Sequence, residues 1–190
     1  MITKWIEEQT FTNVSYCGQK LIQTEFDTCR FLNCDFSEAD WSESDLVNCR
    51  FDNCNFALAK FSGTGMKEVQ FAGCKLIGIN FDYCSDFLFS VGFQKCSLDY
   101  SSFAEKKMKK SKFADSSMKE VDFSGADLSQ SSFDDCDLSG AVFHYTNLEK
   151  ADFRSAFNYS FDPELNKIKK ALFSQTGVLG LLQKYGIEIR

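Results

Sequence analysis

Nine cysteines and one histidine are the residues in this 190-residue chain whose chemistry could build a metal or redox site. Zinc sites and dithiol catalysts commonly use a Cys-x-x-Cys pair, and the sequence contains none. Cys34, Cys54 and Cys74 instead lie twenty residues apart, and Cys96 and Cys136 continue this spacing after a shift of two residues. Such spacing indicates cysteine used as a small apolar residue in a stack of repeating units. We therefore predict no metal and no cofactor.

His144 is a poor candidate for a catalytic base, because no nucleophile is recognisably paired with it. The sequence also lacks a glycine-rich phosphate-binding loop. Gly63, Gly65, Gly78 and Gly92 fall at corner or flanking positions of the repeat that organises the chain. The sequence therefore predicts a protein that is not an enzyme.

That repeat is a large apolar residue at every fifth position, which begins at Phe11 and continues almost to Phe153. An α-helix requires apolar spacing near 3.6 and a strand requires 2, so a sustained period of five belongs to neither. The residue two positions before each large one is usually small, as Cys29, Cys34 and Ala39 are. One large and one small column therefore point inward, and the polar positions between them point to water.

This pattern resembles the pentapeptide-repeat family, whose loose motif places a small residue, Asp or Asn, and a large apolar residue in succession. The cleanest matches are residues 126–128, 136–138 and 151–153, which read Ala-Asp-Leu, Cys-Asp-Leu and Ala-Asp-Phe. The resemblance implies an all-β solenoid, a right-handed quadrilateral β-helix in which four repeats make one turn. The repeats would then form about seven coils.

In such a solenoid, side chains twenty residues apart would stack on one another, and the sequence supports this independently. Reading every twentieth residue from Phe11, with a shift of two after Phe71, gives phenylalanine eight times. Sorting by twenty is not required by a period of five, so it favours four walls. The expected core ladder is Phe11, Phe31, Phe51, Phe71, Phe93, Phe113, Phe133 and Phe153.

The chain divides into three predicted parts: an N-terminal cap at residues 1–8, the repeat at residues 9–160, and a C-terminal region at residues 161–190. The two-residue shift lies between Phe81 and Leu88, where we expect a bulge or short loop at one corner. Lys106 occupies a small inward position. An unpaired buried ammonium would be very unfavourable, so we expect this corner to open and the lysine to reach solvent.

The C-terminal region carries signals for a capping α-helix. Asp162 suits the N-cap and Pro163 the first turn, and the apolar residues 165, 168, 172 and 173 have helical spacing. The tail beyond Gly177 resembles the C-terminal module of the Qnr-like quinolone-resistance group of this family, which joins two rods end to end as a homodimer. The alternative is a tail that only caps its own chain. The residues expected to dimerise or cap are Leu179, Leu182, Tyr185, Ile187 and Ile189.

The Qnr-like group acts by resembling DNA. The resemblance therefore implies an acidic rod that occupies the DNA-binding saddle of a type II topoisomerase, DNA gyrase or topoisomerase IV, and gives quinolone resistance. The net charge is −6, and residues 113–160 hold nine acidic and three basic residues beside the expected dimer end. The candidate DNA-mimicking surface is Asp115, Glu120, Asp122, Asp127, Asp134, Asp135 and Asp137.

The middle of the chain favours a second hypothesis, a protein-interaction scaffold with an unrelated partner. A basic patch, which would be repelled by a DNA-binding groove, comprises Lys106, Lys107, Lys109, Lys110 and Lys112. Phe87 and Phe89 lie beside the two-residue shift, where exposed aromatic residues would form a candidate contact corner. The alternatives are a solvated face for the lysines and local packing for the two rings.

Two further classes of partner are not expected. The overall acidity and the burial of the aromatic ladder argue against direct nucleic-acid binding. No apolar run approaches the roughly eighteen residues of a membrane helix, and the N-terminus lacks a signal sequence. We therefore predict a cytoplasmic protein without membrane contact.

Overall fold

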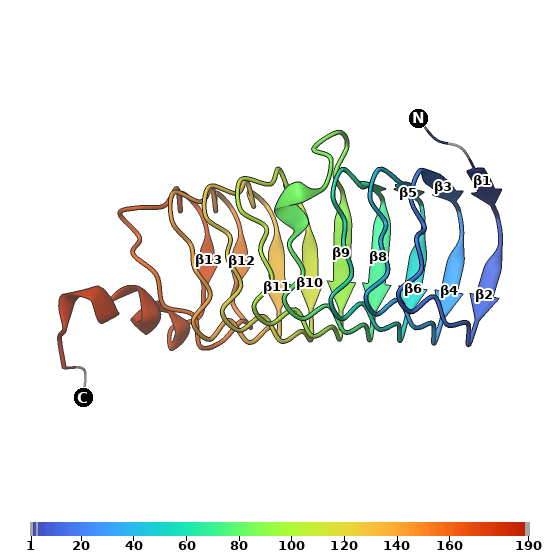
Figure 1. The fold of residues 1–190 in the computed structure, drawn as a ribbon. Coiled ribbons are helices and arrows are strands. Elements are labelled where there is room, and N and C mark those ends of the chain that lie inside the picture. The colour runs from blue at the N-terminus through green and yellow to red at the C-terminus, as the bar shows by residue number, and fades with distance from the viewer. Residues whose placement is uncertain (1, 3, 189–190) are drawn as a thin grey trace.

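The structure is a computed structural model that describes residue 2 and residues 4–188. The chain winds into a rod of stacked turns whose strands lie parallel to one another (Figure 1). Each strand pairs with the strand one turn later along the chain, which makes the rod a parallel β-solenoid. The predicted fold class is confirmed.

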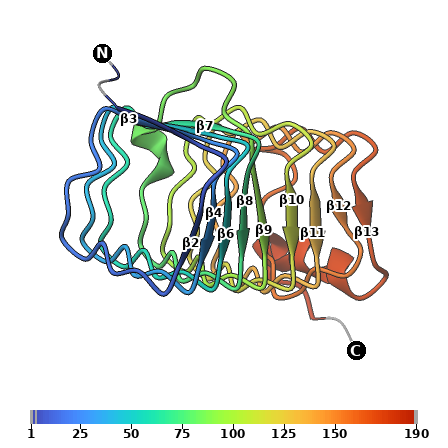
Figure 2. The same cartoon turned by 90° about the vertical axis from the view of Figure 1, so that its right-hand side faces the viewer.

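The rod has four faces, which we number in the order in which the chain passes them from Thr10 onward. Face 1 is a nine-stranded parallel sheet that follows the rod from end to end (Figure 2). At one strand per turn the nine strands span eight turns, against about seven predicted, because β13 lies beyond residue 160. The strands are β2 (Thr10–Thr12), β4 (Arg30–Leu32), β6 (Arg50–Asp52), β8 (Val69–Ala72), β9 (Val91–Gln94), β10 (Lys112–Ala114), β11 (Ser132–Asp134), β12 (Asp152–Phe153) and β13 (Leu172–Phe173).

The other three faces have fewer regular strands. Face 4 begins with the parallel strands β1 (Lys4–Glu7), β3 (Thr24–Asp27), β5 (Asp45–Val47) and β7 (Gly65–Lys67). It continues through single bridges that join Lys107, Asp127, Asn147 and Lys167. Single bridges define face 2 through Ser15, Asp35, Asn55, Lys75, Ser97, Ser117, Asp137 and Phe157, and face 3 through Lys20, Asp40, Lys60, Asn80, Ser102, Asp122 and Val142.

The predicted phenylalanine ladder lies in the core behind face 1. Phe31 and Phe51 stack with ring centroids 4.7 Å apart and ring planes 6° apart. Phe173 adds a ninth ring, 5.4 Å from Phe153. Rings on neighbouring faces meet edge to face, as Phe31 and Phe36 do at 5.4 Å. Both geometries are favourable for aromatic pairs, so the ladder holds successive turns and neighbouring faces together.

The corners between faces are formed by residues with positive φ. Asn13, Asn33 and Asn53 occupy one corner in three successive turns, with φ between 51° and 55°, and Gly73 follows in the next turn. Asparagine and glycine adopt this left-handed conformation at the lowest cost. The polar positions of the repeat therefore include a recurring turn signal.

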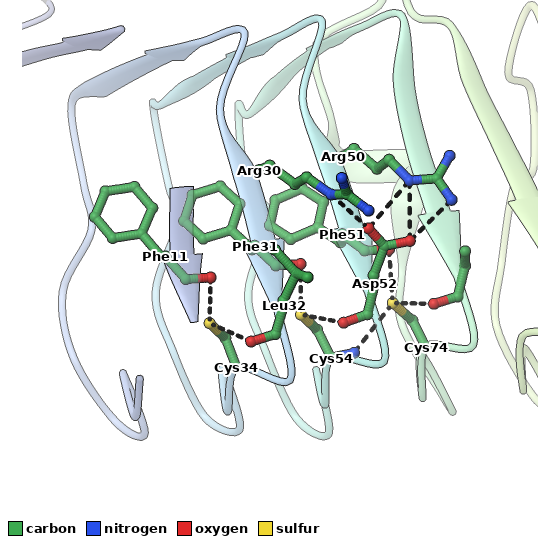
Figure 3. A network of polar contacts seen from close by, with 11 residues as sticks. Phe11, Arg30, Phe31, Leu32, Cys34, Arg50, Phe51, Asp52, Cys54 and Cys74 are labelled. Atoms are coloured by element: carbon green, nitrogen blue, oxygen red, sulfur yellow. Dashed lines mark hydrogen bonds and ion pairs between the residues drawn. The ribbon is translucent and has the colours of Figure 1, made fainter. Parts of the chain in front are cut away.

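The small inward position contributes hydrogen bonds as well as space. The thiols of Cys34, Cys54 and Cys74 donate to the carbonyl oxygens of Phe11, Phe31 and Phe51, at 3.6, 3.5 and 3.4 Å (Figure 3). Hydroxyl groups make the same contact elsewhere, such as Thr64 Oγ1 to the Trp41 carbonyl at 2.9 Å. Cysteine in this column thus joins each turn to the turn before it. The sequence alone predicts only that these cysteines fill space.

Two ends of the repeat differ from the sequence-based expectation. Residues 4–7 of the predicted N-terminal cap form β1, in which Ile6 lies in register with Phe26. The predicted capping α-helix does not form, because residues 161–173 make a further turn of the solenoid. Asn166 Nδ2 donates to the Phe143 carbonyl at 2.7 Å from the position where a small residue usually lies. Only then come two short 3-10 helices, η2 (Gly177–Leu181) and η3 (Gln183–Tyr185).

The two-residue shift forms a loop that projects from the rod (Figure 1, green). The chain keeps a twenty-residue register as far as Tyr83, at the end of η1 (Phe81–Tyr83). Val91 then lies twenty-two residues after its partner Val69, and from β10 onward the spacing between turns is twenty again. The sequence predicts Leu88 as the next inward residue, but Leu88 is exposed with φ 55° and Phe89 is buried instead. The inserted residues therefore displace the inward position by one.

The burial of the thiols predicts their reactivity. Desolvation raises the pKa of Cys49, of Cys84 and of Cys136 to about 12 in each case, so these thiols stay protonated at neutral pH. Cys17 is the exposed cysteine. We expect a thiol reagent such as DTNB to label one cysteine in the native protein and all nine in denaturant. Rapid labelling of several cysteines in the native protein would contradict the buried columns.

Candidate functional site

The register of the solenoid decides which charged side chains are neighbours. Residues five apart lie on adjacent faces, whereas residues twenty apart lie one above the other on the same face. A cluster of acidic residues in the sequence is therefore distributed around the rod. Charges that act together must be sorted by face rather than by position in the chain.

Sorted in this way, faces 2 and 3 with their corners form one acidic side of the rod. This side carries twelve acidic residues and four lysines, whereas acidic and basic residues are nearly equal in number on faces 1 and 4. The four lysines are Lys20, Lys60, Lys75 and Lys119. Lys184 of the tail also reaches this side, where its Nζ lies 2.6 Å from Asp162 and 2.9 Å from Glu164. The twelve acidic residues are Asp35, Glu38, Asp40, Glu43, Asp82, Asp99, Glu105, Glu120, Asp122, Asp137, Asp162 and Glu164.

The predicted DNA-mimicking residues divide between the two sides of the rod. Asp137 and Glu120 lie on face 2 or its corner, and Asp122 lies on face 3. Asp115 and Asp135 lie at the corner where face 1 meets the acidic side. The structure therefore brings five of the seven onto or beside one surface.

The other two predicted acidic residues lie elsewhere. Asp134 belongs to β11 on face 1, and Asp127 lies on face 4 in direct register with Lys107. The candidate surface predicted from the sequence did not include the acidic residues between positions 35 and 105, because charge was summed along the sequence and not by face. The twenty-residue spacing, applied to the charged positions, could have found them.

Local contacts fix part of the acidic side. Burial alone would raise the pKa of Asp137, but hydrogen bonds from Ser139 and Asn158 outweigh it and hold that pKa below its ordinary value. Lys119 lies 3.5 Å from the same carboxylate. Asp137 is therefore ionised at neutral pH and keeps a fixed orientation on face 2.

The inserted loop is attached to the rod by a buried lysine. Lys106 is 2% exposed, and its Nζ donates to the Cys84 carbonyl at 2.6 Å and to Asp86 Oδ1 at 2.7 Å. The ammonium also lies 5.3 Å from the centroid of the Phe89 ring. The prediction that Lys106 reaches solvent is therefore wrong, because the loop brings a carboxylate and a carbonyl to the lysine.

The loop presents one of the two predicted contact aromatics and buries the other. Phe87 is 78% exposed, whereas Phe89 is 7% exposed and packs in the core. Phe87 and Leu88 border a hollow of about 260 Å³ on face 4 together with Val47, and Glu25 and Asp45 also line it. The hollow is therefore apolar with both acidic residues and Lys67 in its lining.

The predicted basic patch is smaller than the sequence indicates, because Lys106 is buried. Lys107, Lys109 and Lys110 are exposed on face 4, and Lys112 begins β10 on face 1. The patch therefore faces away from the acidic side. Its charge does not interrupt the acidic surface.

The C-terminal tail packs on the last turn and leaves apolar side chains outward. Leu181 is buried, and Gly180 lies so close to the Tyr159 carbonyl that a Cβ would collide with it. Leu179 and Ile187 are 42% and 55% exposed. Both border a hollow of about 200 Å³ with Leu182, Tyr185 is exposed nearby, and Ile189 lies outside the described residues.

Neither a metal site nor a membrane-spanning helix is found in the described part of the chain. Within residue 2 and residues 4–188, no group of three or more His, Cys, Asp or Glu side chains could hold a metal ion. No helix in this part of the chain has the length and apolar character needed to cross a membrane. The candidate sites are thus surfaces: the acidic side, the loop hollow, the lysine patch and the tail.

Comparison with known proteins gives one family and several similar folds. A family model described as a pentapeptide repeat region matches residues 24–103, 44–123 and 85–160, which together cover more than half of the chain. HetL, a pentapeptide repeat protein involved in heterocyst differentiation regulation from the cyanobacterium Nostoc sp. strain PCC 7120, has a TM-score of 0.73 at 17% identity. That match covers 90% of this chain and 87% of HetL.

A second solved structure is a trypsin-treated variant of QnrB1, a plasmid-mediated fluoroquinolone resistance protein. Its TM-score is 0.57 at 18% identity, and the match covers 98% of this chain and 97% of that chain. At such identities both likenesses establish the fold alone. Among curated proteins no match is found.

The pairing of Lys106 with Asp86 can be tested by unfolding. Asp86→Ala leaves the buried ammonium without its carboxylate, and we expect a loss of about 2 kcal/mol in the free energy of unfolding. Lys106→Met combined with Asp86→Ala removes the charge with its partner and should recover most of that loss. Urea denaturation of the three proteins checks this. If Asp86→Ala is as stable as the parent, the loop does not hold the lysine.

Proposed function

The chain belongs to the pentapeptide-repeat family, and from this premise we propose that it is a non-enzymatic rod whose acidic side binds a type II topoisomerase in place of DNA. Its partner would be DNA gyrase or topoisomerase IV, and binding would give quinolone resistance. The observation that carries the proposal is the excess of acidic residues on faces 2 and 3, where all twelve lie either within residues 35–43 or from Asp82 onward. A basic groove shaped for a duplex attracts such a surface.

The magnitude of the charge defines what kind of mimic the rod would be. Eight turns at about 4.8 Å per turn give a length of about 38 Å. A duplex of this length carries on the order of 20 negative charges. The acidic side provides twelve acidic residues against four lysines and Lys184 of the tail, which pairs with Asp162 and Glu164, and the other two faces provide almost no net charge. The rod would therefore enter the groove in one orientation, with faces 2 and 3 toward the enzyme.

The tail supports a homodimer in the same proposal. Exposed Leu179 and Ile187 border an apolar hollow at the end of the rod, where a second copy would bury them. End-to-end pairing doubles the length of the acidic side. Leu181 and Gly180 meanwhile pack on the chain's own last turn. Capping would therefore use these two residues, and dimerisation would use Leu179 and Ile187.

The second candidate function is an interaction scaffold with an unrelated partner at the loop hollow. The observation that favours it is the exposed Phe87 on a loop anchored by Lys106 and Asp86. An exposed aromatic side chain on a fixed backbone loses little entropy on binding. This candidate and the first use opposite sides of the rod, so variants separate them.

The acidic side is tested by reversing four exposed corner glutamates. Glu38, Glu43, Glu105 and Glu120, each changed to Lys, should weaken inhibition of gyrase supercoiling by at least ten-fold, because the surface facing the groove loses its negative charge. The matched control reverses Glu7, Glu8, Glu25 and Glu149 on face 4 and should change inhibition less than three-fold. Equal effects of the two sets would contradict the one-sided mimic. Loss of binding in Phe87→Ser would favour the loop instead.

The dimer is tested by sedimentation velocity. Leu179→Asp with Ile187→Asp places charges in the apolar hollow, and we expect the protein to change from dimer to monomer. Leu58→Asp is the control, since Leu58 is 72% exposed on the acidic side and should leave the dimer intact. A parent protein that already sediments as a monomer at micromolar concentration would refute end-to-end pairing.

A further inference from the structure

The two-residue insertion leaves a recess at the corner where face 4 turns into face 1. The recess has a volume of about 310 Å³ and is lined by residues of β9 and of its two neighbours in the sheet, β8 and β10. Its polar lining includes Gln70, Ser90 and Ser111, and its cationic lining is Lys109, Lys110 and Lys112. Nothing in the acidic-side proposal uses this feature.

The recess exists because the turn containing the insertion has small residues at this corner. Glu68 and Lys110 occupy the corner in the turns before and after, both with positive φ, whereas the corresponding residue in between is Ser90. Gly92 lies in register between Gln70 and Lys112. A Cβ on Gly92 would collide with Gln70 Oε1, so the glycine lets the Gln70 amide extend over the recess.

The charge of the recess is uncompensated. Within residues 4–188, none of Lys109, Lys110 and Lys112 has a carboxylate within ion-pair distance. Glu68 is the acidic residue of the lining, and its Oε1 accepts a hydrogen bond from Ser90 Oγ at 3.5 Å. Three ammonium groups around one carboxylate repel one another unless an anion joins them.

We propose that this recess binds a compact oligophosphate, such as inorganic pyrophosphate or the diphosphate end of a nucleotide. Lysine binds phosphoryl oxygens as a mobile point charge with three donors, and three lysines match an anion with several charges in a small volume. The Ser111 hydroxyl and the Gln70 amide supply neutral donors. A ligand with a single negative charge would leave two of the lysines unpaired.

The test is calorimetric titration of the full-length protein with inorganic pyrophosphate at low salt. We expect saturable binding at one site per chain. Lys109→Gln, Lys110→Gln and Lys112→Gln together should weaken it at least ten-fold. The control combines Lys167→Gln, Lys169→Gln and Lys170→Gln, which remove the same charge from exposed positions of face 4 and should weaken binding less than three-fold.

A neutral variant separates a built recess from surface charge. Gly92→Gln fills the recess without changing the charge, and its contact is with the movable end of Gln70, so the fold should survive thermal melting. We expect at least ten-fold weaker binding. Absence of saturable binding at millimolar pyrophosphate, or equal weakening in both lysine triples, would overturn the proposal. Inorganic phosphate or sulfate binding as tightly as pyrophosphate would overturn the oligophosphate assignment.

Discussion

Every feature of this protein depends on the stacking of each turn directly on the turn before it. Backbone hydrogen bonds between parallel turns fix the vertical position, as in Asn53 N to the Ala72 carbonyl at 2.7 Å. The inward rings must then lie over one another, and the small inward residue must contact the carbonyl one turn earlier. This constraint is strong enough that Trp41 fills a ring position although its buried indole N–H has no partner within residues 4–188. Such an unsatisfied donor costs about 1–3 kcal/mol.

The same constraint leaves the outward positions free, and function lies in how they are used. Stacking turns a charge at one outward position into a column of charges when the residue twenty positions later repeats it. On faces 2 and 3 no acidic residue is followed by another twenty positions later, so the acidic side is an excess of separate carboxylates; Lys107, Lys109 and Lys110 lie on face 4. The insertion after Tyr83 shifts the register between two turns to twenty-two residues, and it creates the exposed Phe87, the buried Lys106 and the corner recess together. The insertion thus gives faces 1 and 4 features that the acidic side lacks.

The features set by the five-residue period could be predicted from the sequence. The features set by departures from that period could not. The phenylalanine ladder was predicted ring by ring, because burial requires the same residue class at every twentieth position. The partners of Lys106 were not predictable, since Asp86 and Cys84 reach it only through the conformation of a loop without a repeat. The C-terminal helix was predicted wrongly because Leu165, Ile168 and Leu172 have helical spacing, whereas Ile168 and Phe173, five residues apart, continue the repeat. Stacking of Phe173 on Phe153 decides for the repeat. The acidic surface was predicted only in part, because its residues were grouped by position in the chain instead of by face of the rod.

The central claim is that the acidic side replaces DNA on its partner, and competition for a duplex tests it most directly. A fluorescent duplex bound to DNA gyrase would be titrated with the full-length protein while its anisotropy is followed. The account predicts complete displacement of the duplex, with a midpoint that rises in proportion to the duplex concentration and with added salt. Binding of the protein to gyrase while the duplex stays bound would contradict DNA mimicry.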